Sequence, residues 1–286
     1  MVMAWLFLGI LSFLSYSIST SIDKHMMSKK YDVLRTNTLK MLFDGLILLV
    51  LGIIFFELNL KVEILIGAFF LGLLYAAAGV AYFTSLRLGE VSKVVPFLQS
   101  SEILLTFIAA IIIFQENASI INFLGVALII LGAYAVLSEE QLRLPRLGKL
   151  PFLIFLVTLF DVAYWLLAKK LLFDIKPIDL GVGTYLSSAV ILFIYQLLFR
   201  RKTLEGVPPI MRTMPKIALA AFFGAMGTLL VFSALSIADA SDVYPLAGLQ
   251  SVFIFVIALI FLKEKFCWHR LLGTALVAMG IFCVSL

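Results

Sequence analysis

A carboxylate stands inside one of the longest apolar stretches of this sequence, where an ionisable side chain is costly. Glu102 lies in the run Val94 to Phe114 and shares a helical face with Gln99 and Thr106, at spacings i, i+3 and i+7. A charged residue at the centre of a membrane helix costs roughly 2.5–3.5 kcal/mol on insertion scales, so it is a candidate for function. Glu102 fits two interpretations: a carboxylate that carries a coupling proton, or a protonated structural Glu.

Asp161 is a second such carboxylate, in the middle of the run Leu150 to Ala168. Thr158, Tyr164 and Trp165 lie within about one helical turn of it. Asp161 could bind a substrate amine or a proton, or it could form a hydrogen bond or salt bridge to a neighbouring helix. We favour the functional interpretation and place Trp165 beside it in the pathway.

Asp44 is a third, and Lys40 precedes it by four residues. This spacing predicts an ion pair on one face of a helix, near the membrane interface. For this pair the structural interpretation is favoured over a functional one.

The first apolar run, Val2 to Ile22, carries a polar face. Ser12, Ser15, Ser19 and Asp23 follow one another at spacings of 3, 4 and 4 residues. Serines inside a membrane either hold helices together or line a cavity, and both interpretations stand. Ser15, Tyr16 and Ser19 are therefore candidates for the substrate or ion pathway.

The elements that hold these residues must be membrane helices. Hydrophobic residues make up 63% of the 286 residues and charged residues 14%, against roughly 45–50% and 25% in soluble domains. The excess apolar surface must face a lipid bilayer, which leaves the backbone of each span to satisfy itself as a helix. The net charge of +5 fits basic cytoplasmic connectors, so we expect no nucleic-acid partner.

Ten apolar runs predict ten spans of about 20 residues each. They are Val2–Ile22, Thr38–Phe56, Ile64–Leu86, Val94–Phe114, Ile120–Leu137, Leu150–Ala168, Leu180–Phe199, Ile217–Ile237, Tyr244–Leu262 and Trp268–Val284. Only two connectors, Asp23–Asn37 and Arg200–Lys216, are long enough to hold any structure of their own, and neither could form a soluble domain.

The sequence repeats itself, which predicts two five-helix halves. At an offset of 149, Leu86, Ser92, Val94 and Pro96 match Leu235, Ser241, Val243 and Pro245, respectively. At 148, Glu116, Gly125 and Gly132 match Glu264, Gly273 and Gly280; at 146, Ser15 and Lys24 match Asp161 and Lys170. Gln250 then lies at the depth of Glu102 and is also a pathway candidate. An odd number of spans per half places the second half upside down, an inverted repeat. The predicted units are residues 1–138 and 150–286, joined by a linker at 139–149.

Matched residues at the ends of spans are candidates for gates or cavity mouths. Lys24 and Lys170 could attract an anionic substrate, although snorkelling to the interface explains them as well. Pro96 and Pro245 open their spans, where proline is well tolerated in a first helical turn, and a hinge is the alternative.

The distribution of basic residues predicts the orientation. Connectors after the odd-numbered spans hold 18 of the 22 Lys and Arg residues, and the others hold 4. The positive-inside rule then places both termini outside the cytoplasm.

The repeated block Gly89 to Pro96, followed by a helix ending in Gln115–Glu116, Gly125 and Gly132, resembles the EamA-type branch of the drug/metabolite transporter superfamily. The second half repeats it with Pro245, Glu264, Gly273 and Gly280. The resemblance implies ten helices in two inverted repeats around a central cavity, in a cell-membrane carrier that works by alternating access. Members move amino acids, nucleosides, sugars and other metabolites. They commonly have both termini in the cytoplasm, opposite to the charge count.

Other classes of protein lack their sequence signals. No G-x-x-x-x-G-K-[ST] loop, H-E-x-x-H, G-x-S-x-G or T-V-G-Y-G segment occurs. Two histidines and two cysteines leave no metal-ligand pattern. Asp239 and Asp242 form a D-x-x-D, but the repeat places it in a connector. We therefore expect a secondary transporter with no catalytic residue, metal or cofactor, with a membrane enzyme or a channel-like pore as alternatives.

Overall fold

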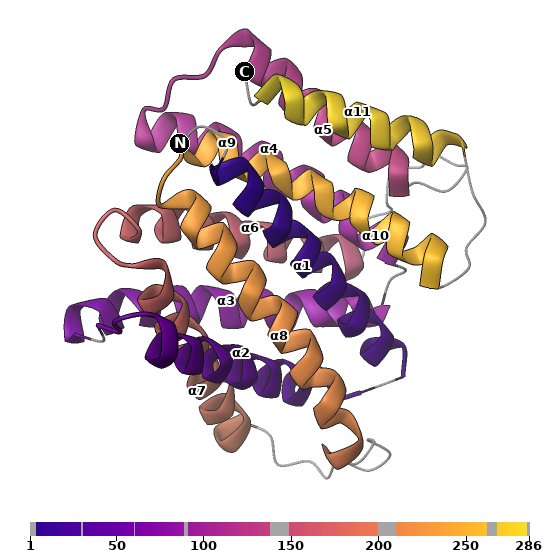
Figure 1. Cartoon of the computed structure of the whole chain (residues 1–286). Coiled ribbons are helices and arrows are strands. Elements are labelled where there is room, and N and C mark those ends of the chain that lie inside the picture. The colour runs from indigo at the N-terminus through magenta and orange to yellow at the C-terminus, as the bar shows by residue number, and fades with distance from the viewer. Residues whose placement is uncertain are drawn as a thin grey trace.

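The computed structural model describes residues 4–29, 31–59, 61–88, 91–137, 149–199, 210–261 and 268–284. Within these ranges every regular element is a helix (Figure 1). The helices are α1 Ala4–Ser28, α2 Val33–Phe55, α3 Val62–Leu88, α4 Val91–Phe114, α5 Ile120–Leu137, α6 Lys149–Leu171, α7 Pro177–Phe199, α8 Ile210–Leu235, α9 Ala240–Val243, η1 Tyr244–Ala247, α10 Gly248–Phe261 and α11 Trp268–Val284.

Seven segments in the described ranges are long and apolar enough to cross a membrane: most or all of α1, α2, α3, α6, α7 and α8, and the stretch from α9 into α10. Shorter apolar helices lie within α4, α5 and α11. Large apolar side chains remain on the outside of the bundle, among them Ile53, Ile112, Leu197 and Phe282, each 64–70% exposed. An exposed apolar surface of this extent fits contact with lipid, so the chain is a multi-pass membrane protein.

Helix α1 is longer than its apolar run. It continues through Asp23 to Ser28, and α2 begins at Val33, so the long connector expected between Asp23 and Asn37 is wrong. The helices continue because their polar residues face inward: Asp23 and Asn37 are both buried. Hydropathy detects the apolar stretch of a helix, and inward-facing charged residues extend the helix beyond it.

Helices of the first half of the chain pack in pairs against helices of the second half. Helix α1 packs along α8 and α3 along α6, while α2 packs on α7 and α5 on α11. Contacts across α5 and α11 join Gly125 to Gly280 and Gly132 to Gly273, so the numbers rise on one helix as they fall on the other. Helices α5 and α11 therefore run antiparallel, and α1 begins at the same end of the bundle at which α11 ends (Figure 1).

Glycines explain how closely α5 and α11 approach. A Cβ atom on Gly280 would lie 2.5 Å from the carbonyl oxygen of Gly125, and one on Gly132 would lie 2.6 Å from that of Gly273. No Cβ makes contacts this short with a backbone atom, so only glycine fits at these positions. The glycines matched by the repeat therefore serve the close packing of α5 on α11.

The fourth helix of the second half is interrupted. A single turn, α9, leads into the 3₁₀ segment η1, and α10 follows. Pro245 is in the first turn of η1, where its missing N–H leaves no bond unmade. Pro96 differs, because α4 begins at Val91. The expectation that Pro96 opens its helix is therefore wrong, since it lies in the second turn.

Candidate functional site

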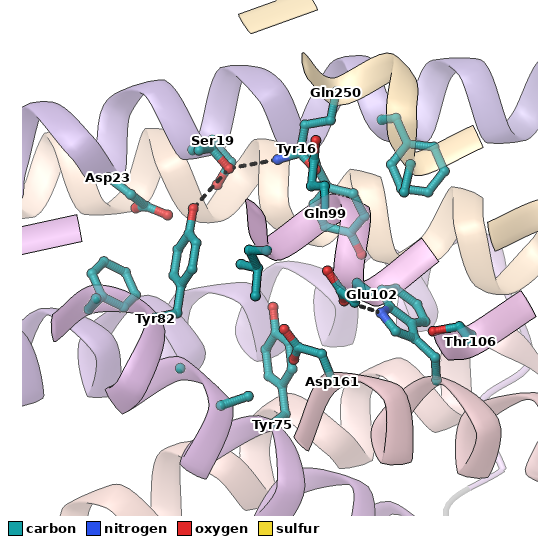
Figure 2. Close-up of a pocket in the computed structure, with 18 of the residues that line it drawn as sticks. Tyr16, Ser19, Asp23, Tyr75, Tyr82, Gln99, Glu102, Thr106, Asp161 and Gln250 are labelled. Atoms are coloured by element: carbon teal, nitrogen blue, oxygen red, sulfur yellow. Dashed lines mark hydrogen bonds between the residues drawn. The ribbon is translucent and has the colours of Figure 1, made fainter. Parts of the chain in front are cut away.

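A cavity of ≈ 160 Å³ lies between helices of both halves. Figure 2 shows polar side chains that enter it from α1, α3, α4, α6 and α10. Its polar and aromatic lining consists of Phe13, Tyr16, Ser19, Thr20, Asp23, Lys40, Tyr75, Tyr82, Phe83, Gln99, Glu102, Thr106, Asp161, Trp165, Tyr244 and Gln250.

The carboxylates of Glu102 and Asp161 share one part of this cavity. The indole Nε1 of Trp165 donates a hydrogen bond of 3.1 Å to Glu102 Oε1, which joins α4 to α6. Asp161 precedes Trp165 by one turn on α6 and lines the cavity as well. Figure 2 shows the two carboxyl groups on the same side of the cavity as the Tyr75 ring. An ammonium group or a proton would find two acidic partners here.

The face predicted on α4 points into this cavity. Gln99, Glu102 and Thr106 all line it, and Gln99 Nε2 donates to Gln250 Oε1 at 2.9 Å. Gln250 Nε2 in turn donates to Thr20 Oγ1 at 3.0 Å. Helices α4, α10 and α1 are thereby joined across the cavity by a chain of amides and a hydroxyl.

Aromatic rings form another wall. The ring centroids of Tyr75 and Tyr164 are 4.9 Å apart, those of Tyr164 and Trp165 are 5.0 Å apart, and those of Trp165 and Tyr244 are 5.8 Å apart. The hydroxyl of Tyr244 donates to the carbonyl oxygen of Trp165 at 2.5 Å. Rings around acidic groups are a common setting for organic cations.

The serine face of α1 divides between packing and lining. Ser12 and Ser19 donate to the carbonyl oxygens of Gly227 and Ala220 on α8, at 2.8 and 2.9 Å, and Ser19 also borders the cavity. Ser15 donates to Leu11 of its own helix at 2.9 Å and is not part of the lining. Tyr16 lines the cavity, with its hydroxyl 2.7 Å from Thr228 Oγ1.

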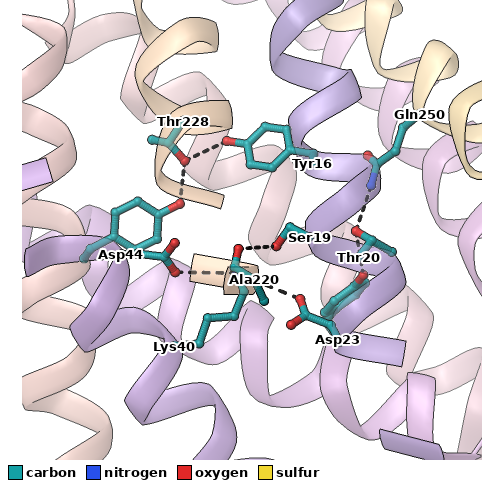
Figure 3. A network of polar contacts seen from close by, with 11 residues as sticks. Tyr16, Ser19, Thr20, Asp23, Lys40, Asp44, Ala220, Thr228 and Gln250 are labelled. Carbon is teal, nitrogen blue, oxygen red and sulfur yellow. Dashed lines mark hydrogen bonds and ion pairs between the residues drawn. The ribbon is translucent and has the colours of Figure 1, made fainter. Parts of the chain in front are cut away.

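A cluster of charges that sequence reasoning set aside lies at the other end of the cavity (Figure 3). Lys40 Nζ is 3.5 Å from Asp44 Oδ2, which confirms the predicted ion pair, and 3.9 Å from Asp23 Oδ2. These three side chains are only 0–6% exposed, so the cluster is buried between helices. Asp23 comes from a different helix, where it ends the polar face predicted on α1, but the sequence does not show that this face meets Lys40 and Asp44.

The matched lysines are Lys24 and Lys169, not Lys24 and Lys170. Lys24 Nζ donates to the carbonyl oxygen of Leu86 at 3.1 Å. Lys169 Nζ donates to that of Leu235 at 2.9 Å, and Leu235 is the repeat partner of Leu86. Lys170 is exposed. The correct offset for this pair of helices is therefore 145, which matches Asp161 with Tyr16 and explains why Ser15 is not in the lining.

Glu116, two residues beyond the end of α4, holds the beginning of α9. Both carboxylate oxygens of Glu116 accept backbone N–H groups, from Ala240 at 2.9 Å and from Ser241 at 2.8 Å. These are N–H groups that the first turn of a helix leaves unpaired. Asp239, the first residue of the D-x-x-D, precedes this turn as its N-cap, where it lies outside the cavity lining.

Comparisons with known proteins give one family. The model of the EamA-like transporter family matches residues 3–138 and, a second time, residues 149–286. A crystal structure of a protein of 14% identity superposes with a TM-score of 0.78, over 99% of this chain and 98% of the other. At that identity the likeness shows a shared fold alone. A search of curated protein sequences gave no match.

Proposed function

Because the chain belongs to the EamA-like transporter family, we propose that it is a secondary active transporter of a small metabolite across the cytoplasmic membrane. The observation that carries the proposal is the cavity itself. It is lined by acidic, amide and hydroxyl groups, and its lining residues come from both halves of the chain. Solute sites of this kind, at the interface of two repeats, are typical of carriers.

The proposed architecture is ten membrane helices in two inverted five-helix repeats, with α9, η1 and α10 counted as one span. Its support is the direction of equivalent helices. The fifth helices of the halves, α5 and α11, run antiparallel. The second helices do so too, because Thr38 of α2 bonds Gln196 of α7 while Gly45 meets Leu186. Rocking of one half against the other would then open the cavity to alternate sides.

The proposed substrate is a small polar solute such as an amino acid, a nucleoside or a sugar-like metabolite. The cavity of ≈ 160 Å³ is smaller than typical pockets for drug-sized ligands, at about 300–1,000 Å³. Glu102 and Asp161 would bind an ammonium group or a coupling proton, and the amides of Gln99 and Gln250 would bind hydroxyl or carbonyl groups.

The substrate class can be identified by thermal unfolding of the purified protein with amino acids, nucleosides, sugars and organic cations. A ligand present at 100 times its dissociation constant stabilises the folded state by about 2.7 kcal/mol. We expect one class alone to raise the unfolding temperature and to show counterflow in proteoliposomes. A channel-like pore would show flux without counterflow, and that result would refute a carrier.

The role of Glu102 is tested with the substrate so identified. We expect Glu102→Gln to flatten the dependence of uptake on pH, because the amide keeps the bond to Trp165 but cannot exchange a proton. Asp239→Asn is the matched control, since Asp239 lies outside the cavity lining and its loss would matter to diphosphate chemistry rather than to transport. A pH profile of Glu102→Gln equal to that of the wild type would refute the proton role.

We propose that both termini lie outside the cytoplasm, from the 18 basic residues on one side against 4 on the other. A protein without Cys267 and Cys283 but with Lys202→Cys should react with an impermeant maleimide only after the cells are opened. Labelling of intact cells would reverse the orientation and leave the transporter proposal untouched.

A further inference from the structure

We propose that Asp23, Lys40 and Asp44 form a second proton-binding site, separate from Glu102, at the place where α8 closes on α1 and α2. The binding of the proton is a property of the cluster itself. Its use as a coupling ion rests on the proposed transport function.

The first argument is the number of charges. Two carboxylates share one ammonium group, with Lys40 Nζ 3.5 Å from Asp44 Oδ2 and 3.9 Å from Asp23 Oδ2 (Figure 3). Asp44 is 0% exposed and Asp23 3% exposed. With every group ionised the cluster carries one net negative charge, and an uncompensated buried charge costs several kcal/mol. One bound proton makes the cluster neutral.

The second argument is that each carboxylate has an oxygen to spare. Asp23 Oδ1 and Asp44 Oδ1 are buried and have no hydrogen-bond partner among the described residues. The two distances to Lys40 also exceed the 2.7–2.9 Å of a tight charge-assisted hydrogen bond. The ammonium group is therefore divided between two acceptors and fully satisfies neither.

The third argument concerns the surroundings. The other titratable groups that face the cluster are tyrosines: Tyr16 of α1, Tyr75 and Tyr82 of α3, and Tyr185 of α7. Their hydroxyls carry no positive charge. The Tyr16 and Tyr185 hydroxyls are hydrogen-bonded to Thr228, and the Tyr82 hydroxyl is bonded to Thr20. From α8 the described contacts are made by Gly224 and by the backbone of Ala225, which faces the Asp44 carboxylate. None of these groups supplies a positive charge.

The location connects the proton to movement of the two halves. A Cβ atom on Gly224 of α8 would lie 2.6 Å from Asp44 Oδ1 and 3.0 Å from Lys40 Nζ, so the α8 backbone lies directly on the cluster. Asp23 and Lys40 line the cavity, whereas Asp44 lies behind them. A hydronium ion in the cavity can transfer its proton to a free carboxylate oxygen and leave as water, and release reverses this step. Separation of α8 would hydrate the cluster and favour release.

The test is infrared difference spectroscopy of the reconstituted, full-length protein between mildly acidic and mildly alkaline pH, in potassium chloride. The protein carries ¹³C in the aspartate side-chain carboxyl groups, which shifts aspartate bands and leaves glutamate bands in place. We expect a label-sensitive band from a protonated carboxyl group that Asp161→Asn and Glu102→Gln retain. The double variant Asp23→Asn, Asp44→Asn should lose it.

Persistence of the band in the double variant would overturn the proposal. Absence of the band from the folded wild type or from Asp161→Asn would also overturn it. These two measurements do not depend on whether a variant of the cluster folds. Loss of the band on replacing potassium by sodium chloride would also overturn it, by showing that the site takes a metal cation. The spectrum requires no substrate. If the band is present but the protein moves no solute, the proton site is supported and the transport proposal is weakened. If the protein moves a solute but the band is absent, only the proton site is refuted.

Discussion

Lys40→Met isolates the energetic role of the ammonium group in the buried cluster. Methionine has nearly the volume of the lysine stem, so the change removes the charge and leaves the packing largely intact. Asp44 and Asp23 then lose the ammonium group that lies 3.5 Å and 3.9 Å from their carboxylate oxygens, respectively. Breaking a buried ion pair by removing one partner costs about 3–5 kcal/mol.

This magnitude is large enough to measure. At about 2–4 °C per kcal/mol, we expect the unfolding temperature of Lys40→Met at neutral pH to fall by roughly 6–20 °C. The unpaired carboxylates bind protons in the folded protein more readily than in the unfolded chain. Stability therefore falls with rising pH, and the deficit relative to the wild type should shrink as the pH is lowered.

Thermal unfolding of purified Lys40→Met in detergent, followed by intrinsic fluorescence across a pH series, gives both quantities. The control is the triple variant Asp23→Asn, Lys40→Met, Asp44→Asn, which removes the whole set of charges and should recover much of the loss. A deficit that stays constant with pH, or a triple variant less stable than Lys40→Met, would show that the ammonium stem packs rather than compensates charge.

Two further predictions follow from contacts on other helices. Lys169→Met should destabilise the protein by about 1–3 kcal/mol, because it removes the donor to the carbonyl oxygens of Leu235, the last residue of α8, and of Ala238. Lys170→Met should stay within roughly 0.5 kcal/mol; equal unfolding temperatures for the two would contradict this assignment. Gly280→Ala should cost about 1–3 kcal/mol through overpacking, because its Cβ would lie 2.5 Å from the Gly125 carbonyl oxygen, and an unfolding temperature equal to that of the wild type would show that α5 and α11 separate easily.

Several residues of the site could be predicted because burial of a polar side chain in a membrane helix is costly. Glu102 and Asp161 are predicted for that reason, Gln99 from the helical face that it shares with Glu102, and Gln250 from the repeat; all four line the cavity. Hydropathy needs no structure to find them, since the cost depends on residue type and on the surrounding apolar run.

The direction in which a side chain points could not be predicted as well. A helix has 3.6 residues per turn, so an error of one residue in an alignment rotates the assignment by about 100°. The offset of 146 chose Ser15 and Lys170, while the contacts of Lys24 and Lys169 require 145. Apolar residues surround these positions on both helices, so composition does not show which side of each helix faces the cavity.

The burial of Lys40 and Asp44 was missed for a different reason. Their spacing predicts a helical ion pair, but it does not show that another helix covers the pair. They are buried because α1 extends beyond its own apolar run and brings Asp23 against them. Asp23 lies on the polar face predicted for α1, but the local sequence does not show which helix that face meets.

The carboxylate of Glu116 links the two halves of the chain. It belongs to the first half, yet it holds the first amides of α9, in the second. When the end of α4 tilts, the interrupted helix α9–η1–α10 must either move with it or lose hydrogen bonds to Glu116. Separation of the two halves at this end of the bundle therefore exposes the first turn of α9 with its N–H groups unpaired.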